Sequence, residues 1–454
     1  MAIESINPAT GELIRRFEPL SGDAIQQKLD LASKAFKSYA AVPMSHRSLC
    51  MRKLANLLEE DAVELAEMIT TEMGKPIKAS HAELAKCAAA CRYYAENAVR
   101  MLAPEIITTE ASRSYVRWDP LGVVLAVMPW NFPFWQVFRF LAPALMAGNV
   151  GLLKHAPNVP QCALAIESLV RRAGFPRGTF QTLLIETRQV DGVLADERIV
   201  AVTLTGSESA GRAVGAQAGW LIKKSVLELG GSDPFLVMSS ADLDLAVENA
   251  VQSRCINSGQ SCIAAKRFIV HAAIYNEFER LFVAAMAAMR VGDPMIDATQ
   301  IGPMATRRQL ENLDQQVNAA ITAGAKLLTG GRRILGPGFY FEPTVLAGLP
   351  RTASVYHDEI FGPVALLFKA NDLNQAIEMA NDTPFGLAAS AWTRDPDEQQ
   401  RMVTEIQAGS VFLNKMVASD PRLPFGGIKH SGYGRELSAA GMREFMNAKT
   451  VVIA

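Results

Sequence analysis

The sequence lacks the marks of a nucleic-acid, membrane or metal-binding protein. Its 45 basic and 46 acidic residues nearly cancel, to a formal net charge of −1, and no run of five or more Lys or Arg occurs. No electrostatic surface for nucleic acid or for a membrane is therefore expected. The most apolar stretch, residues 121–128, ends at Pro129 and is far short of the ~20 residues that a membrane helix needs. The six histidines are scattered, with none near a cysteine or acid at ligand spacing, so no metal site is expected.

Cysteine is also scarce. The six cysteines show no paired short spacings, a usage that fits a reducing compartment. The first residues, MAIESINP, lack the basic and then apolar layout of a signal peptide and are too acidic for a transit sequence. We expect a cytoplasmic protein with free thiols whose partners are small molecules.

The chain is long and strongly patterned. At 454 residues it exceeds the roughly 250 to 300 residues at which one hydrophobic core stops growing, so two or more domains are expected. Residues 22–101 place apolar side chains at three- and four-residue intervals, which predicts helices. From residue 121, apolar strands alternate with helices, which predicts an α/β fold with a parallel sheet covered on both faces. Strands are expected at 123–127, 150–154, 180–184 and 200–204, and helices at 135–147 and 161–173.

A second α/β unit is expected after Gly231, with strands at 268–270 and 364–367. Residues 104–117 alternate as a short strand pair, and residues 449–454 contain an apolar strand at the chain terminus. An apolar strand without a partner is an exposed edge, and a subunit interface is one way to cover it.

The most informative residue is Cys262, which ends the segment Asn-Ser-Gly-Gln-Ser-Cys, with Glu228 upstream in Leu-Glu-Leu-Gly-Gly. A thiolate can attack an electrophilic carbon, and the resulting thioester needs an activated water to release it. An isolated cysteine is more often a small buried hydrophobe, but Cys262 lies among small and polar residues without a periodicity that would bury it. The other cysteines keep that structural interpretation: Cys50, Cys87, Cys91, Cys162 and Cys255.

The motifs Asn-x-Gly-Gln-x-Cys and Glu-Leu-Gly-Gly strongly resemble the aldehyde dehydrogenase superfamily, and the resemblance runs from Asn7 to the last strand. It implies that Cys262 is the nucleophile and that Glu228 deprotonates the water that hydrolyses the thioester. Asn131 follows a strand in Met-Pro-Trp-Asn-Phe-Pro; alone it would be a turn residue. The resemblance gives its amide, with the Cys262 backbone N–H, the task of stabilising negative charge on the aldehyde oxygen.

The resemblance also implies a division of the chain. A cofactor-binding domain is expected from residues 1–103 and 118–230, a catalytic domain from 231–409, and an oligomerisation ribbon from 104–117 and 440–454. Residues 410–439 carry the family's C-terminal Pro-Phe-Gly-Gly segment and are expected to line the substrate tunnel. A homodimer or homotetramer is expected.

The expected cofactor site begins where the strand at 200–204 runs into Gly206, Ser207 and Gly211, which open a helix. A helix N-terminus with glycines can receive a phosphate, although a plain turn is the commoner meaning of such a pair. No Gly-x-Gly-x-x-Gly is present, and the P-loop Lys and Ser/Thr are missing after Gly211. The spacing matches the family's dinucleotide motif, which implies that Ser207 lies near the pyrophosphate.

The same resemblance assigns other residues to the cofactor. Lys154 would hold the adenine-ribose hydroxyls, and the position where many NAD-preferring relatives carry a glutamate is Pro157. Without that acid nothing obvious excludes NADP, so both NAD and NADP are expected as cofactors. Isolated, Glu359 and Phe361 could be a solvated acid and a core aromatic. Their Glu-Ile-Phe-Gly-Pro motif implies contacts to the nicotinamide ribose and ring, and the motif neighbours expected beside the cofactor are Trp130 and Leu229.

Arg139 bears on the substrate, because it lies in an apolar helix where a guanidinium either reaches back to water or binds an anion. Succinate-semialdehyde dehydrogenases carry an arginine at this offset and a serine where Ser419 stands; Phe132 is expected in the same tunnel. Their second arginine is replaced by Ile256, and Arg254 is two residues away from that position. Either the affinity is lower, or the tunnel accepts other ω-carboxylated or neutral aldehydes. The resemblance therefore implies oxidation of succinate semialdehyde to succinate, as in 4-aminobutyrate or putrescine degradation.

Two other interpretations stay open at the level of sequence. The first is a general aliphatic or aromatic aldehyde dehydrogenase in which Arg139 is structural. The second, more remote, is a non-catalytic binding protein on the same fold.

Overall fold

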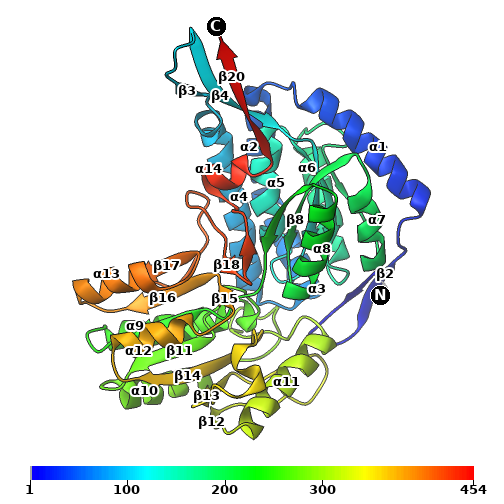
Figure 1. The fold of residues 1–454 in the computed structure, drawn as a ribbon. Coiled ribbons are helices and arrows are strands. Elements are labelled where there is room, and N and C mark those ends of the chain that lie inside the picture. The colour runs from blue at the N-terminus through cyan, green and yellow to red at the C-terminus, as the bar shows by residue number, and fades with distance from the viewer. Residues whose placement is uncertain (1–2) are drawn as a thin grey trace.

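The computed structural model describes residues 3–454 and contains two large sheets, one above the other in Figure 1. The upper sheet has six strands in the order β19-β9-β8-β5-β6-β7, parallel except for β19. Its strands are β5 (Val123–Met128), β6 (Val150–His155), β7 (Phe180–Thr182), β8 (Ile199–Thr205), β9 (Lys224–Glu228) and β19 (Gly432–Tyr433).

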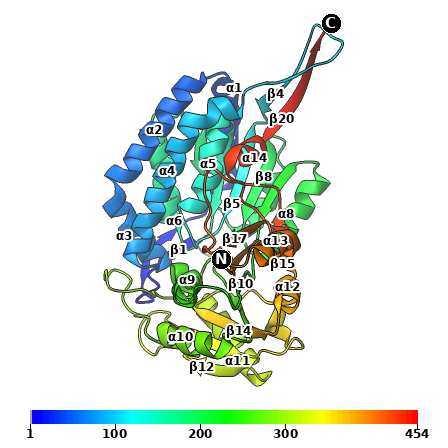
Figure 2. The same cartoon turned by 90° about the vertical axis from the view of Figure 1, so that its left-hand side faces the viewer.

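Helices cover both faces of this sheet, with α4 and α5 on one side and α8 on the other (Figures 1 and 2). The helices of this half are α1 (Gly22–Tyr39), α2 (Met44–Glu60), α3 (Ala62–Met73), α4 (Ile77–Met101), α5 (Trp135–Ala147), α6 (Pro160–Arg172), α7 (Val190–Ala195) and α8 (Glu208–Trp220).

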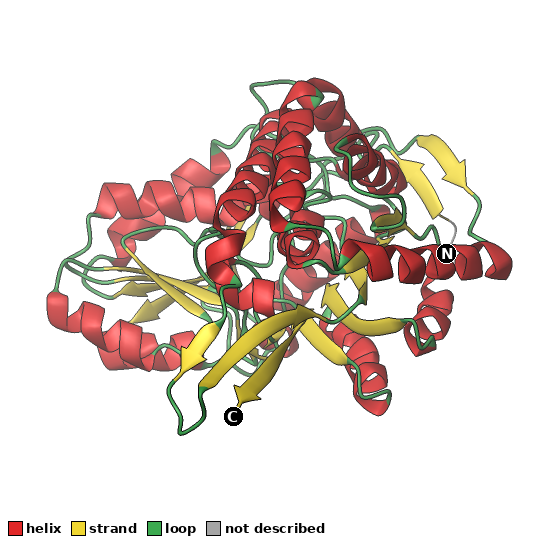
Figure 3. Ribbon diagram, turned by 90° about the horizontal axis from the view of Figure 1, so that it is seen from above, coloured by secondary structure: helices red, strands yellow, loops and turns green. Residues whose placement is uncertain are grey.

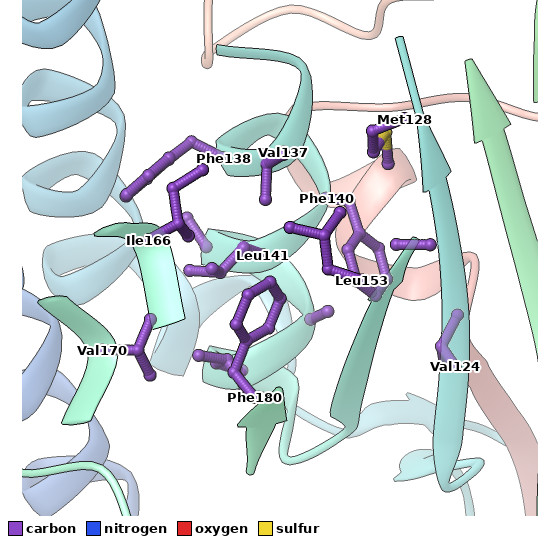
Figure 4. Packing of buried hydrophobic residues seen from close by; sticks show 14 of the residues in the cluster. Val124, Met128, Val137, Phe138, Phe140, Leu141, Leu153, Ile166, Val170 and Phe180 are labelled. Carbon is purple, nitrogen blue, oxygen red and sulfur yellow. The ribbon is translucent and has the colours of Figure 1, made fainter. Parts of the chain in front are cut away.

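Every residue of α5 is buried, as expected for a helix whose side chains are apolar on every face apart from Gln136 and Arg139. Figure 4 shows Val137, Phe140 and Leu141 of α5 packed among side chains of β5, β6 and α6. The helix ends at Gly148, whose φ of 95° lies in the left-handed region that glycine adopts without strain. This packing fixes the loop that precedes α5.

The strand order of the upper sheet reverses between β5 and β8. From β5 the chain moves through β6 to β7 on one side and returns to β8 on the other. Ligands of such open α/β sheets bind at the carboxyl ends of the strands that flank this reversal. The segments that start there are the loop after Met128 and the turn after Thr205.

The lower sheet has seven strands in the order β12-β13-β14-β11-β10-β16-β17, parallel except for β12. Its strands are β10 (Pro234–Val237), β11 (Arg267–His271), β12 (Lys326–Thr329), β13 (Thr344–Ala347), β14 (Val364–Ala370), β16 (Ala388–Trp392) and β17 (Ser410–Leu413). The helices of this half are α9 (Leu243–Cys255), α10 (Tyr275–Ala287), α11 (Arg307–Thr322), α12 (Leu373–Asn381) and α13 (Pro396–Glu405).

An antiparallel ribbon projects from the upper half and carries the C-terminus (Figures 1 and 3). It consists of β3 (Glu105–Ile107), β4 (Arg113–Pro120) and β20 (Met446–Ile453), in the order β20-β4-β3, and α14 (Ser438–Arg443) precedes β20. Two smaller pairs are β1 (Ile3–Ile6) with β2 (Leu13–Phe17), and β15 (Phe385–Gly386) with β18 (Ile428–Lys429).

The predicted α/β class is confirmed, as are the predicted helices and strands to within three residues at their ends. Two strand ends differ from the expected division of the chain. β4 continues to Pro120, and β17 starts at Ser410 and pairs in parallel with β16. A strand at Ser410–Leu413 therefore belongs with the sheet assigned to 231–409 and not with the C-terminal segment 410–439. We otherwise retain the predicted division as a proposal.

None of the helices within residues 3–454 is both long and apolar enough to cross a membrane. Within the same residues, no group of three or more His, Cys, Asp or Glu side chains is arranged to hold a metal ion.

Candidate active site

The loop before Cys262 is held in an unusual backbone conformation. Asn257, Ser258 and Gly259 have φ values of 55°, 57° and 75°, a region that costs an L-residue about 1–2 kcal/mol each. A Cβ on Gly259 would lie 2.3 Å from the carbonyl carbon of Gly362, so only glycine fits there. The close contact brings the Glu-Ile-Phe-Gly segment against the loop that presents Cys262.

The Cys262 thiol is half-buried, whereas the other five cysteines are buried; all six are free. Burial raises the pKa of the Cys262 thiol to about 12, and nearby Arg139 and Lys266 oppose that rise. Lys266 Nζ donates hydrogen bonds to the carbonyl oxygens of Cys262 at 2.6 Å and Ser261 at 2.8 Å. The resting thiol is therefore protonated, and a step that removes its proton must precede attack on an electrophile.

Two hydrogen-bond donors are available next to the thiol. Asn131 Nδ2 donates one hydrogen to the Gln260 carbonyl at 3.1 Å, and an amide carries a second. No hydrogen bond between described residues uses the Cys262 backbone N–H. Asn257 Nδ2 donates to the Asn131 carbonyl at 2.7 Å, which ties the two loops together. This arrangement can stabilise an oxyanion formed on Cys262.

His155, at the end of β6, holds the Asn131 loop in place through hydrogen bonds. The Ala156 N–H donates to His155 Nδ1 at 2.9 Å, and so Nε2 carries the proton and donates to the Pro133 carbonyl at 2.9 Å. Burial lowers the pKa of His155 to about 4, so the imidazole is neutral at physiological pH.

Glu83 of α4 anchors the other end of the same loop. Its Oε1 accepts hydrogen bonds from the backbone N–H groups of Phe134 and Trp135, each at 2.8 Å. These N–H groups lie at the start of α5, and the unpaired N–H donors of a helix N-terminus stabilise a carboxylate there. Its Oε2 pairs with buried Lys75, whose Nζ lies 3.9 Å from the centre of the Phe132 ring.

Glu228, at the end of β9, is buried, and neither carboxyl oxygen has a hydrogen-bond partner among the described residues. Burial and the neighbouring Glu436 raise the pKa of Glu228 well above its usual range. A Cβ on Gly426 would lie 2.7 Å from Glu228 Oε1, so the carboxyl group rests against the C-terminal segment. It lines neither of the two chambers described next, and a base role requires the side chain to turn towards Cys262.

A first chamber of about 200 Å³ lies at the strand reversal and reaches Cys262. Of the residues predicted to bind the cofactor, six line it: Trp130, Gly206, Ser207, Leu229, Glu359 and Phe361. The Trp130 and Phe361 rings meet edge to face with centroids 5.8 Å apart. Glu359 accepts the Gly231 N–H at 3.0 Å and lies 3.5 Å from Lys266 Nζ. The chamber can hold a flat ring between aromatic and acidic groups.

Three predicted cofactor residues lie outside this chamber. Gly211 packs against Leu229, because a Cβ there would lie 2.5 Å from a Leu229 methyl carbon, so its glycine brings α8 close to β9. Pro157 is half-buried. Lys154 is buried, and burial lowers the pKa of its ammonium group. No hydrogen bond or ion pair with another described residue is found for Lys154, so this cation lacks the anionic or polar partner that a buried charge needs.

A second chamber, of about 210 Å³, reaches Cys262 from the side of α4 and α5. The three residues predicted to bind substrate, Phe132, Arg139 and Ser419, all line it. Ile256 is also in its wall. Arg254 is not, because its guanidinium is buried and donates to the carbonyls of Gly259 at 2.7 Å and Val364 at 3.3 Å. Arg254 therefore does not replace the arginine that is missing at Ile256.

The Arg139 guanidinium does not reach bulk water, and it forms an ion pair within the protein. It is buried, its Nη2 lies 2.7 Å from Glu436 Oε2, and its guanidinium carbon lies 4.6 Å from the centre of the Phe425 ring. Its Nε has no hydrogen-bond partner among the described residues. Neither alternative considered from the sequence included this ion pair, since Glu436 lies far along the chain.

Sequence reasoning missed several residues that line the chambers. Gln136 lines both, Gln309 of α11 lines the first, and Lys86 of α4 and Trp135 line the second. Gln136 and Trp135 follow the Met-Pro-Trp-Asn-Phe-Pro motif directly and could have been found by extending it along α5. Lys86 and Gln309 lie in helices whose sequence pattern gives no sign of a site.

The two chambers and the thiol between them are the arrangement of an α/β enzyme that acts on a small molecule beside a nucleotide. The chain matches the aldehyde dehydrogenase family over residues 1–451 and belongs to it.

Individual relatives extend this result. The chain is 54% identical, over 454 residues and 100% of both chains, to a Synechocystis sp. protein named probable succinate-semialdehyde dehydrogenase (NADP+). It is 54% identical, over 457 residues and again 100% of both chains, to Mycobacterium tuberculosis succinate-semialdehyde dehydrogenase (NADP+) 1. The crystal structure of succinic semialdehyde dehydrogenase from Streptococcus pyogenes with NADP+ superposes with a TM-score of 0.97 at 36% identity, covering 99% of each chain.

Proposed function

We propose that this protein oxidises succinate semialdehyde to succinate with NADP or NAD. The observation that carries the proposal is the second chamber, an otherwise largely apolar space at Cys262 whose wall contains Arg139 and Ser419. Cationic and hydroxyl groups in such a wall suit an aldehyde that bears a carboxylate. The names of the relatives point to the same substrate.

In the proposed reaction, Cys262 gives its proton to a water molecule and its Sγ electron pair bonds the aldehyde carbon. The Asn131 amide and the Cys262 N–H stabilise the oxyanion that forms. The C–H bond then breaks with its electron pair, which the nicotinamide cofactor accepts as hydride when bound, and a thioester remains on Cys262. Glu228 takes a proton from water, the water oxygen bonds the thioester carbon, and the C–S bond breaks to release the acid and the thiolate.

The cofactor proposal rests on Lys154. This buried ammonium group without a partner fits the 2′-phosphate of NADP as well as the ribose hydroxyls of NAD, and Pro157 supplies no acid to repel a phosphate. We expect Pro157→Glu to shift the ratio of catalytic efficiencies towards NAD by on the order of tenfold, through repulsion of the 2′-phosphate. Steady-state kinetics with both cofactors measure the ratio, and an unchanged ratio means that residue 157 does not face the ribose.

The Arg139–Glu436 ion pair favours the second candidate, a general aldehyde dehydrogenase with Arg139 structural. Arg139→Leu separates the two. If Arg139 contacts the substrate carboxylate, kcat/KM should fall about 10- to 100-fold for succinate semialdehyde and little for butyraldehyde. An equal fall for both aldehydes assigns Arg139 to the structural ion pair.

The activity itself is tested by an aldehyde panel with each cofactor, followed by absorbance of the reduced nicotinamide. We expect succinate semialdehyde to give a higher kcat/KM than butyraldehyde, which has the same chain length without the charge. Equal efficiencies support the general aldehyde dehydrogenase, and no reduced cofactor with any aldehyde supports the non-catalytic alternative.

We further propose a cytoplasmic homodimer or homotetramer that serves 4-aminobutyrate or putrescine degradation. Support for assembly comes from the ribbon, whose side chains Ile106 and Val452 are 66% and 61% exposed. Apolar side chains on a projecting strand are a surface that another subunit can cover.

A further inference from the structure

Lys86, on α4, lines the second chamber together with Arg139 and Ser419. Its Nζ donates a hydrogen bond to Ser419 Oγ at 2.7 Å and lies 4.4 Å from the centre of the Trp135 ring. An ammonium group has three N–H donors, and the Ser419 bond uses one of them. Two donors therefore remain for a ligand in the chamber.

Among the charged groups in this wall, Lys86 is also the one for which no ion pair with a described residue is found. Three charged side chains line the chamber: Glu83, Lys86 and Arg139. Glu83 is paired with Lys75, and Arg139 with Glu436. No ion pair is found for Lys86, so the wall carries one uncompensated positive charge, and an anion in the chamber would neutralise it.

Ser419 is arranged to assist. Its hydroxyl oxygen accepts hydrogen bonds from Lys86 Nζ and from Trp135 Nε1 at 3.2 Å. A hydroxyl has two acceptor sites and one donor. Both acceptor sites are occupied by these groups, so the Ser419 proton is left to be donated to an acceptor in the chamber.

We propose that Lys86, with Ser419, binds the carboxylate of the aldehyde substrate and supplies the second cationic contact that Ile256 does not. This inference rests on the proposed function and identifies the residue that would select an ω-carboxylated aldehyde. The Lys86 ammonium and the Ser419 hydroxyl hold one end of the substrate, while Cys262 attacks the other. Arg139, held by Glu436, adds its positive field to the same chamber.

The charged state of Lys86 gives a second observable. Burial, followed by the nearby charge of Arg139, lowers the pKa of Lys86 to about 8, and Glu83 and Cys87 on its own helix and Asp420 in the C-terminal segment oppose this fall. Below its pKa the ammonium is charged and binds an anion; above it, this attraction is lost. The KM for succinate semialdehyde should therefore rise as the pH increases through about 8.

The test compares Lys86→Met, which keeps the length of the side chain and removes the charge, with Lys86→Arg and with Lys78→Met. Lys78 is an exposed lysine on the same helix. For Lys86→Met we expect the ratio of kcat/KM for succinate semialdehyde to that for butyraldehyde to fall about 10- to 100-fold, mainly through KM. Lys86→Arg should restore most of the ratio, and Lys78→Met should keep that of the wild type.

The outcomes separate this inference from the proposed function. A wild-type enzyme that does not prefer succinate semialdehyde overturns the proposed function and the inference with it. A wild-type preference that survives in folded Lys86→Met, with the rise of KM at alkaline pH still present, overturns the inference alone. If Lys86→Met does not fold, the pH dependence of KM in the wild type and in Lys86→Arg provides the test. A rise of KM through pH 8 that Lys86→Arg moves to higher pH supports the inference about Lys86. An identical pH profile for Lys86→Arg overturns that inference.

Discussion

Glu228 and Glu436 are two buried acids close to one guanidinium, that of Arg139. The direct ion pair is between Arg139 and Glu436, and burial raises the pKa of both acids. Burial and the nearby Glu436 therefore disfavour the ionised form of the Glu228 carboxyl group in the ligand-free protein. We infer that Glu228 acts as a base after its side chain has rotated away from Glu436 and towards Cys262, because its ionised form is then less disfavoured.

We predict that Glu228→Gln slows release of the thioester far more than its formation. General-base catalysis is worth about 10²- to 10⁴-fold, so a burst of reduced cofactor should precede a steady rate lowered by about that factor. Rapid-mixing absorbance measures both phases. Glu405→Gln, which removes an exposed acid paired with Arg401 on α13, is the control and should keep wild-type kinetics. Equal slowing of burst and steady rate would place the function of Glu228 elsewhere.

Individual residues differ in how well the sequence predicts them. Cys262 and Asn131 belong to short motifs that resemble those of the aldehyde dehydrogenases, and this resemblance implied that the two residues lie close together. Lys86 and Ser419 are 333 residues apart, and neither lies in a motif with the other. The Arg139–Glu436 pair is likewise formed between distant segments. Contacts of this kind depend on how helices pack, which local spacing does not encode.

At the scale of elements, β6 supports the loop after β5 through a neutral His155. Its folded pKa of about 4 lies below the ordinary value of about 6.5. Because the folded state resists protonation, the unfolded chain takes up a proton first as the pH falls. His155 therefore stabilises the protein fully above pH 6.5, and this contribution, up to about 3 kcal/mol, is lost as the pH falls from 6.5 to 4.

We predict that His155→Phe lowers stability at pH 7, since the Pro133 carbonyl loses its donor, and reduces the loss of stability between pH 7 and pH 5. Denaturant midpoints followed by tryptophan fluorescence at both pH values provide the measurement. His81→Phe, at an exposed histidine on α4, should keep the wild-type difference between the two midpoints. The same pH difference in His155→Phe as in the wild type would show that His155 is not the group responsible.

Elements that are buried and periodic were predictable. The helix at Trp135–Ala147 and the strands β5, β6 and β8 follow directly from apolar runs bounded by glycine, proline or polar turns. The two-residue strands β18 and β19 are too short to have a period, and β19 exists because the C-terminal segment returns to pair with Glu228 and Leu227. Tertiary pairing, and not local propensity, creates such strands.

At the scale of the whole molecule, packing within a single chain does not account for the exposed side chains of the ribbon. β20 pairs with β4 over its full length from Met446 to Ile453, yet both carry exposed side chains far from either core. A ribbon of three strands has little apolar surface to bury by itself. Contact with another subunit would supply that burial.

We predict that the double change Ile106→Lys and Val452→Lys lowers the molecular mass of the assembly in solution, because buried lysines without partners oppose association. Size-exclusion chromatography with light scattering measures the mass. Val403→Lys, at a side chain on α13 that is 53% exposed, is a control that should keep the wild-type mass. An unchanged mass in the double variant would mean that the ribbon does not form the interface.

Cys262 and Gln136 belong to the walls of both chambers, so the thiol is reached by two separate routes. An unreactive analogue of the aldehyde bound in the second chamber leaves the first chamber open, and a saturating concentration of nucleotide does not displace the analogue. Inhibition by such an analogue is then competitive towards the aldehyde alone. A nucleotide bound in the first chamber would likewise have its own path to solvent, apart from an acyl group held in the second.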